Sequence, residues 1–310
     1  MTEYMLSISQ DRLGGADVLT PVTTPVPEPG IGQILIRVLA AGVNPIDRTN
    51  RETGLFLGQP PFVLGWDVSG IVEAVGMGVT VHQAGDEVFG MLPFPGAGGA
   101  YAQYVTAPAR AFVAKPGSLH HEEAAALPLA GLTAWQALVD TAHIGAGTRV
   151  LVNGAAGGVG HLAVQIARAL GAHLIAVVST PNVEFARSLG AAEVIDRTKT
   201  DYSVTVRDLD VVLDTAGADP VPAFGSLRAG GTFITLSPRA LAPAREEAER
   251  RGIRAATLLV EADRLALTSL ADLAAAGQLA AAVGATYPLQ QAGQAQEARP
   301  GRGKTVLVLS

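Results

Sequence analysis

The sequence predicts an α/β protein in which a doubly wound parallel sheet is joined to a second domain of β-structure. Three observations support this fold class. The chain has 310 residues, a length typical of two domains. Residues 1–118 contain short apolar segments separated by Gly and Pro, whereas from about residue 119 apolar segments alternate with helical patterns. A glycine-rich turn also joins a strand to a helix at residues 154–160.

The first 118 residues are predicted to form a small barrel or an irregular sheet. Residues 33–40 (QILIRVLA) alternate apolar and polar side chains, as a half-buried strand does. The same signals predict further strands at residues 68–74, 79–81, 86–90 and 100–105.

The second part of the chain is predicted to form a parallel sheet with helices on both faces, because its strands and helices alternate. Its six strands are expected at residues 148–153, 173–179, 193–195, 210–214, 232–236 and 254–259. Helices are predicted over residues 264–276 and 292–299, followed by a strand over residues 304–309. A lone terminal strand needs a partner, so we expect this last strand to return to the first domain.

The turn at residues 154–160 predicts a dinucleotide site. Ala155, Gly157 and Gly160 fill the three positions of the G-x-G-x-x-G fingerprint, with Ala in the first. Such a turn brings backbone N–H groups against a pyrophosphate at the positive end of a helix. The predicted contacts are Ala155, Gly157, Gly158, Val159 and Gly160. The alternative is a glycine-rich turn that holds no ligand.

The residues after the second strand of this unit favour NADPH over NADH. An NAD site usually has an Asp or Glu about 20 residues beyond the glycines, whereas here Ser179 and Thr180 leave room for a 2′-phosphate. Arg187, Arg197 and Lys199 follow, and arginine suits phosphate because its donors form a planar fork. The alternative for Arg187 is the solvated face of a helix.

Composition excludes several classes of function. The net charge of −6 argues against a general nucleic-acid binder, which needs a basic face. No cysteine is present, which rules out disulfides, thiol nucleophiles and cysteine-liganded metal sites. The first residues show no signal-peptide pattern, and the apolar stretch 124–139 contains Pro128 and Gly131, which a membrane span would not favour. A cytoplasmic protein without a membrane segment is expected.

Several segments together resemble the zinc-free quinone oxidoreductase branch of the medium-chain dehydrogenase/reductase superfamily. They occur in the order of that family from one end of the chain to the other. They are AGVNPID (41–47), PFVLGWDVSG (61–70), GDEVFG (85–90), LTAW (132–135), the glycine turn and GKTVL (303–307).

This resemblance implies a GroES-like β-barrel catalytic domain, made of residues 1–118 and 264–310, around a Rossmann domain of residues 119–263. The active site would lie in the cleft between them. The resemblance also implies hydride transfer from NADPH to a quinone or an α,β-unsaturated carbonyl, and a homodimer.

Zinc-dependent relatives hold a catalytic zinc at three positions that match Asn44, Trp66 and Leu129 here. Zinc prefers thiolate, imidazole or carboxylate ligands. None of these three residues supplies one, and Asp67 is the one carboxylate nearby. The expected site contains no metal.

Without a metal, the developing negative oxygen of the substrate needs hydrogen-bond donors. Asn44 is the first candidate, because the resemblance places it where relatives bind metal or substrate; the alternative is that Asn44-Pro45 only forms a turn. Asp47 is expected to orient a loop or the cofactor. Thr133 matches a residue that contacts the nicotinamide end, although it can equally be packing. Trp66 either lines the substrate cleft or fills the barrel core.

Position in the sheet and the resemblance predict further cofactor contacts. Thr215, Leu236 and Ser237 lie where the fourth and fifth strands end, at the edge that faces the ligand in this fold. Arg197 matches a position that contacts the adenosine phosphate, and Arg299 is expected to reach the cofactor from the returning tail.

Two alternative functions stay open at this point. One is a reductase of enoyl thioesters, which a basic patch for a carrier phosphate would support. The other is a non-catalytic NADPH-binding sensor or structural protein, against which the glycine turn and Asn44 argue.

Overall fold

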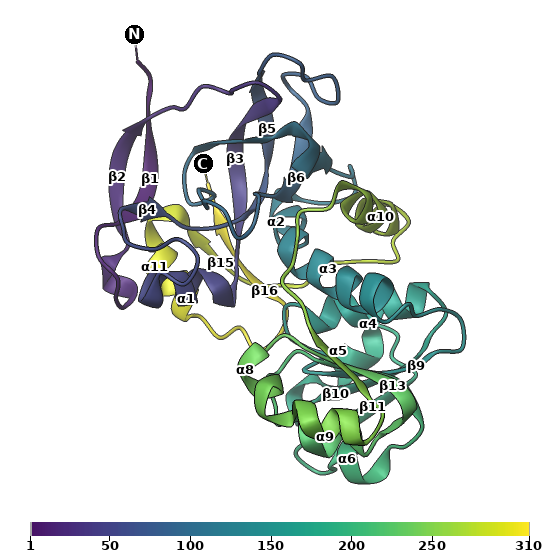
Figure 1. Ribbon diagram of the computed structural model, residues 1–310. Helices are drawn as coiled ribbons and strands as arrows, with labels where there is room; N and C mark the ends of the chain where they lie inside the picture. Colours follow the sequence, from purple (N-terminus) through teal and green to yellow (C-terminus); the bar gives the residue numbers. More distant parts are fainter. Residues whose placement is uncertain (1, 310) are drawn as a thin grey trace.

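The computed structural model describes residues 2–309 and contains two large sheets (Figure 1). The C-terminal part of the chain crosses from one sheet to the other. This crossing is the feature that places distant residues beside one another.

The first sheet is parallel and has six strands in the order β11-β10-β9-β12-β13-β14. This is the doubly wound order that the alternating pattern predicts, and it confirms the Rossmann fold. Its strands are β9 (Arg149–Asn153), β10 (His173–Val178), β11 (Glu193–Asp196), β12 (Leu209–Asp214), β13 (Leu227–Thr235) and β14 (Arg254–Thr257). Its helices are α4 (Gly160–Ala169), α5 (Val183–Ser188), α6 (Tyr202–Thr205), α7 (Pro220–Phe224), α8 (Pro238–Leu241) and α9 (Arg245–Arg250).

The second sheet has seven strands in the order β15-β16-β3-β5-β6-β8, with β7 also paired to β3. The last strand, β16, lies between β15 and β3, so the expected return of the chain end to the first domain is confirmed. These strands are β3 (Gln33–Val43), β5 (Asp67–Val75), β6 (Glu87–Met91), β7 (Tyr104–Pro108), β8 (Phe112–Ala114), β15 (Val283–Pro288) and β16 (Lys304–Val308).

A small third sheet, in the order β2-β1-β4, completes the β-rich part. It comprises β1 (Tyr4–Gln10), β2 (Thr20–Pro25) and β4 (Phe62–Val63). The predicted strand at residues 79–81 is wrong. Gly78 has a φ of +82°, and the Val79 N–H donates to the carbonyl of Gly76, so this segment is a turn that no sheet can pair.

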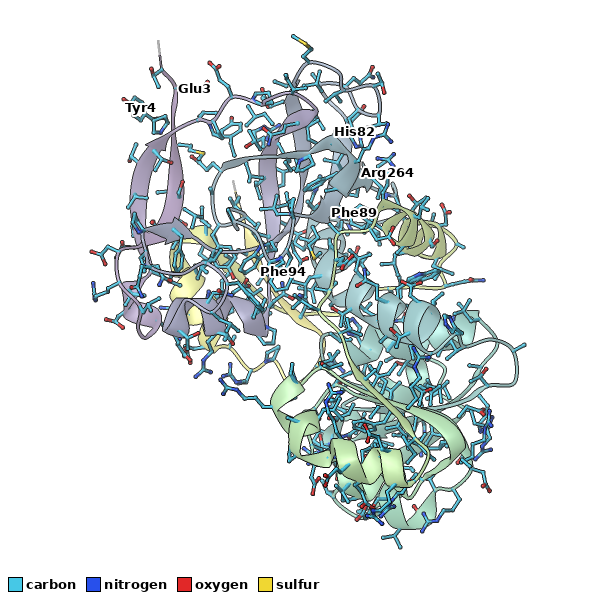
Figure 2. All side chains as sticks on the ribbon, in the orientation of Figure 1. Glu3, Tyr4, His82, Phe89, Phe94 and Arg264 are labelled. Carbon is cyan, nitrogen blue, oxygen red and sulfur yellow. The ribbon has the colours of Figure 1, made fainter. Side chains whose placement is uncertain are left out.

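Three helices lie along the junction of the two parts, namely α2 (His121–Ala125), α3 (Pro128–Trp135) and α10 (Arg264–Ala275), whereas α11 (Ala292–Glu297) packs on β15, β16 and α1 (Pro45–Thr53) in the β-rich part (Figure 1). Arg264 at the start of α10 donates to the carbonyl of Phe112 at 2.9 Å, beside His82, which contacts the same oxygen (Figure 2). The short helix α1 follows β3.

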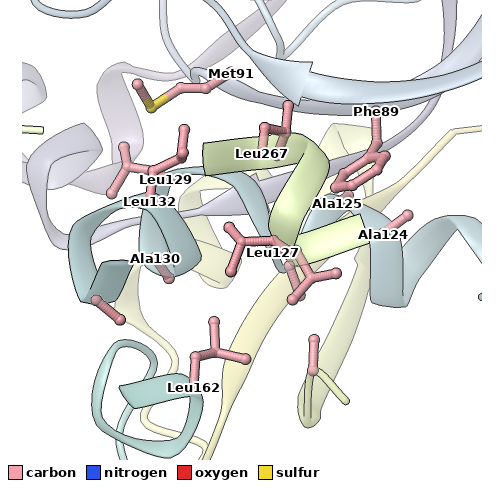
Figure 3. Packing of buried hydrophobic residues seen from close by; sticks show 14 of the residues in the cluster. Phe89, Met91, Ala124, Ala125, Leu127, Leu129, Ala130, Leu132, Leu162 and Leu267 are labelled. Carbon is pink, nitrogen blue, oxygen red and sulfur yellow. The ribbon is translucent and has the colours of Figure 1, made fainter. Parts of the chain in front are cut away.

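One hydrophobic core continues through this junction. Phe89 and Met91 of β6 pack near Leu129 of α3 and Leu267 of α10, with Leu162 of α4 on the Rossmann side (Figure 3). Burying these side chains stabilises the contact between the two parts. The predicted domain limits at residues 118 and 263 stay a prediction. No helix in residues 2–309 is long and apolar enough to cross a membrane.

Candidate active site

A cavity of about 900 Å³ lies where the two large sheets meet. Its lining comes from four parts of the chain: the end of β3 with α1, the start of α3, the strand ends of the Rossmann sheet, and residues 295–305. Ligand sites in open parallel sheets lie at the carboxyl ends of the strands, as this one does.

The glycine turn forms one wall. Gly154 leaves β9 with a φ of +81°, and Gly157 and Gly158 line the cavity with bare backbone. No acceptor within residues 2–309 meets the N–H groups of Gly158 and Val159. Free N–H groups at the start of α4 suit a phosphate, so the turn fits the pyrophosphate of a dinucleotide. Ala155 and Gly160 do not line the cavity; they shape the turn beneath it.

His161 fastens this turn from behind. Its Nε2 accepts the backbone N–H of Ala282 at 3.0 Å, so its Nδ1 carries the hydrogen and donates to the carbonyl of Gly157 at 2.8 Å. Burial lowers the pKa of His161 to about 4, which keeps the ring neutral in this role.

At the end of β10 the cavity is lined by Ser179, Asn182 and Arg197. Thr180 is turned away, because its hydroxyl donates to Asp196 at 2.7 Å. Asp196 also accepts from the hydroxyl and N–H of Thr198, and these bonds hold its pKa at about 2. The carboxylate thus fixes the turn that presents Arg197 to the cavity.

Of residues 2–309, four cations and no carboxylate line the cavity, in a chain whose net charge is −6. They are Arg48, Arg197, Arg299 and Lys304. Arg187 and Lys199 are exposed and paired with Glu184 and Asp196, respectively. Arg48 is paired with Glu52 and Glu297, and Lys304 with Asp67. Arg197 and Arg299 are therefore the two cavity cations left to favour an anionic ligand.

Asn44 lies at the barrel side of the cavity, between two charged groups. Its amide nitrogen donates to Oδ2 of Asp67 at 2.8 Å, and its amide oxygen accepts from the ammonium of Lys304. Lys304 also reaches Oδ2 of Asp67 at 3.2 Å, while Oδ1 of Asp67 accepts the N–H of Leu129 at 2.7 Å. Within residues 2–309, the hydrogens of this cluster that have no partner are the second amide hydrogen of Asn44 and the third ammonium hydrogen of Lys304.

The sheet order explains how these residues meet. In the barrel sheet, β3 lies between β16 and β5, with Thr305 opposite Val43 and Gly42 opposite Asp67. Asn44 follows Val43 directly. Gly42 has no side chain because a Cβ there would lie 2.7 Å from Oδ2 of Asp67, which needs that space to reach Asn44.

Asp47 contacts the backbone of Asn44 from the side away from the cavity and is fully buried. Its Oδ2 accepts the backbone N–H of Asn44 at 2.7 Å and the hydroxyl of Tyr101 at 2.9 Å. Burial raises the pKa of Asp47 from 3.8 to about 7, more than these hydrogen bonds lower it. Asp47 thus holds the backbone at Asn44 and does not line the cavity.

We expect Asp47→Asn to change how stability depends on pH. A pKa raised from 3.8 to about 7 means that the folded protein binds this proton more tightly than the unfolded chain. The wild type therefore loses stability as the pH rises from about 4 to about 7, by up to roughly 1.4 kcal/mol per pH unit. In the wild type the N–H of Asn44 and the hydroxyl of Tyr101 both donate to Oδ2 of Asp47, so the single amide oxygen of an asparagine at this position can accept both.

Urea unfolding of both proteins at several pH values between 4 and 8 measures this. The free energy of unfolding of the variant should gain on that of the wild type as the pH rises, and Asp11→Asn, at an exposed acid, should not show this. Parallel curves for wild type and Asp47→Asn would contradict the shift.

Six of the predicted residues do not line the cavity, namely Asp47, Trp66, Thr133, Ala155, Gly160 and Thr180. Trp66 is fully buried in the barrel core, where its indole N–H donates to the carbonyl of Gly96 at 3.1 Å and its ring meets Phe94 edge-on. Of the two roles considered for Trp66, the geometry favours core packing. Thr133 is buried in α3 and donates to the carbonyl of Leu129 at 2.7 Å, so its hydroxyl hydrogen is occupied within the helix. Thr215, Leu236, Ser237 and Arg299 do line the cavity.

The three positions that match zinc ligands do not fit zinc. The Asn44 amide is held by Lys304 and Asp67. The indole N–H of Trp66 donates a hydrogen bond and offers no lone pair to a metal, and the side chain of Leu129 has no atom that can coordinate one. Within residues 2–309, no group of three His, Cys, Asp or Glu side chains could hold a metal ion.

Comparison with known proteins agrees with this geometry. Residues 30–117 match the family described as the alcohol dehydrogenase GroES-like domain, and residues 189–307 match the zinc-binding dehydrogenase family. The quinone oxidoreductase of Coxiella burnetii superposes on the chain with a TM-score of 0.92 and 33% identity, over 99% of this chain and 100% of that one. The chain belongs to the zinc-free quinone oxidoreductase branch of the medium-chain dehydrogenase/reductase superfamily.

Other members of this superfamily indicate the chemistry. The 2-haloacrylate reductase of a Burkholderia species is 33% identical over 94% of both chains. The Escherichia coli quinone oxidoreductase, solved in complex with NADPH, superposes with a TM-score of 0.87 and 28% identity, over 98% of this chain and 99% of that one. This chain is accordingly an oxidoreductase with a nicotinamide dinucleotide cofactor, and its β-rich part is the GroES-like domain of the superfamily.

Sequence reasoning missed several residues of the site, among them Arg48, Asn182, His161, Asp196 and Lys304. Lys304 stands in the quoted GKTVL segment, as a lone cation at the start of an otherwise apolar strand. A buried lysine needs a partner, and a cation in an apolar strand is the signal by which it could have been found.

Proposed function

We propose that this chain is a zinc-independent reductase that uses NADPH to reduce a quinone or an α,β-unsaturated carbonyl compound. The observation that carries the choice of cofactor is that Ser179, Asn182 and Arg197 line the cavity where β10 ends and no carboxylate of residues 2–309 lines it with them, which suits a 2′-phosphate. The relative crystallised with NADPH supports the same choice. Homodimer formation and a cytoplasmic location stay predictions of the sequence.

The residues at the other end of the cavity support the choice of substrate. A nicotinamide cofactor, when bound, supplies a hydride. Reduction of an enone or quinone places that hydride on carbon, moves an electron pair to the carbonyl oxygen, and is completed by a proton. Asn44 has one amide hydrogen to donate to this oxygen, and the ammonium of Lys304 lies next to it.

The direct test is oxidation of NADPH and of NADH by the purified protein with a quinone, with an alkenal and with an enoyl thioester. Turnover of the first two with NADPH is expected. Faster turnover of the thioester would favour the enoyl-thioester reductase, and tight NADPH binding without any turnover would favour a binding protein.

Arg197→Ala tests the phosphate contact. We expect the dissociation constant for NADPH to rise about tenfold or more, because a charge-assisted hydrogen bond is lost. That for NADH should change little, because NADH has no 2′-phosphate. Arg187→Ala is the matched control, since Arg187 is exposed and paired with Glu184. Fluorescence titration with both cofactors measures this, and equal losses for both would remove Arg197 from the phosphate site.

A further inference from the structure

Lys304 is a charged group in a place where a charge is costly. Its side chain is 4% exposed, and its ion pair with Asp67, which is fully buried, joins two groups that folding removes from water. Apolar residues at both positions could pack as well. A buried ion pair therefore needs an explanation other than stability.

The pair determines which way the Asn44 amide points. An ammonium group only donates hydrogen bonds and a carboxylate only accepts them. The amide oxygen of Asn44 must therefore face Lys304, and its nitrogen must face Asp67, as the structure shows. A flipped amide would place its N–H groups against the ammonium of Lys304, which also only donates, and its oxygen against the carboxylate of Asp67, which also only accepts. The second N–H of Asn44 is thereby left for a ligand in the cavity, which Asn44 lines.

Lys304 also reaches the cavity wall itself. Its aliphatic stem lies beneath the dinucleotide turn, where a Cβ on Gly158 would be 3.1 Å from Cδ of the lysine. The Gly303 N–H donates to the carbonyl of Ala156 at 2.9 Å, which ties the residue before Lys304 to the same turn. The ammonium is thus held between the turn and the Asn44 amide.

We propose that Lys304 is a positioning residue that fixes the donor direction of Asn44, and that together they select a ligand with an anionic oxygen, such as a phenolate or an enolate. The choice of ligand rests on the proposed function. Asp67 holds Asn44 and Lys304 next to each other, because its Oδ2 accepts a hydrogen bond from both.

The test is the binding of 4-nitrophenol, whose phenolate absorbs visible light, compared with 4-nitrotoluene, which has the same shape and no ionisable oxygen. The protein is titrated with NADP⁺ present and again without it. In the wild type we expect preferential binding of the phenolate and a lower apparent pKa for bound nitrophenol than for free nitrophenol. Lys304→Met should lower the phenolate affinity about tenfold or more, and leave that for 4-nitrotoluene within about twofold.

Two further variants separate the role of Lys304 from folding. Lys304→Gln keeps a donor to Asn44 without the charge, so it should lose the pKa shift of bound nitrophenol even if Lys304→Met does not fold. Lys115→Met removes another buried lysine of the barrel, one paired with Glu87 at 3.0 Å, and should leave the selectivity unchanged. Unchanged phenolate preference in Lys304→Gln, or an equal loss in Lys115→Met, would overturn the proposal.

The outcome is distinguishable from failure of the proposed function, because nitrophenol binding requires no turnover. If the protein binds the phenolate selectively but reduces no quinone or enone, the role proposed for Lys304 stands and the proposed reductase activity is refuted. If the protein reduces a quinone or an enone, but substitution of Lys304 leaves phenolate binding unchanged, the proposed function stands and the role of Lys304 is refuted.

Discussion

Replacing Asn44 by alanine is expected to lower kcat/KM for a quinone or an enone by about 10²- to 10³-fold, the usual effect of removing one oxyanion donor. The loss should fall mainly on kcat, because the oxygen becomes fully negative only after the hydride has moved. Removal of the amide also leaves Lys304 and Asp67 with only each other as side-chain partners. Steady-state kinetics with NADPH, together with the cofactor dissociation constant, measure this.

Thr49→Val is the matched control, since Thr49 lines the same cavity from α1 and its hydroxyl is occupied by the carbonyl of Pro45. It should keep kcat/KM within a few-fold of the wild type. If Asn44→Ala retains most of the activity, another donor must stabilise the oxygen, and the assignment of Asn44 is lost.

Replacing Gly160 by alanine is expected to reduce dinucleotide affinity severely and to destabilise the Rossmann part. A Cβ at this position would overlap the carbonyl oxygen of Gly154 and lie 2.8 Å from the Cα of Ala155. Both are backbone atoms of the turn, so they cannot rotate away as a side chain would. The turn must open, and the N–H groups that face a phosphate move with it.

We expect the dissociation constants for NADPH and NADH to rise together, by about tenfold or more, because the pyrophosphate is common to both. This distinguishes Gly160→Ala from Arg197→Ala, which should affect NADPH alone. Gly145→Ala, in the loop before β9, has open space around the added methyl group and should bind both cofactors normally. Normal binding by Gly160→Ala would show that the turn is more plastic than its contacts indicate.

The dinucleotide turn could be predicted from sequence because it is local. The residues that shape it lie within one strand–turn–helix unit, and the left-handed backbone of Gly154 and the crowding at Gly160 are both properties of that short segment. The alternation of strands and helices predicted the parallel sheet for the same reason. Short strands were less predictable. Residues 79–81 have the composition of a strand, but the left-handed backbone of Gly78 places them in a turn.

The charged cluster could not be predicted in this way. Lys304 lies 260 residues from Asn44 and 237 from Asp67, and no pattern within the last strand indicates which strand it joins. Trp66 shows the converse limit. Its matched position suggested a role at the site, but the direction of its side chain depends on the barrel core, where Phe94 and Gly96 meet it. Periodicity and motif spacing carry no such information.

The position of β16 has a consequence for synthesis of the chain on the ribosome. β16 pairs with residues 40–43 of β3, whereas β7 pairs with residues 33–37, so until residues 304–308 emerge the second half of β3 has an open edge. The Rossmann unit is complete long before that point, because its last strand ends at Thr257. A nascent chain thus contains the whole cofactor turn before the cation that lies beside Asn44 is added.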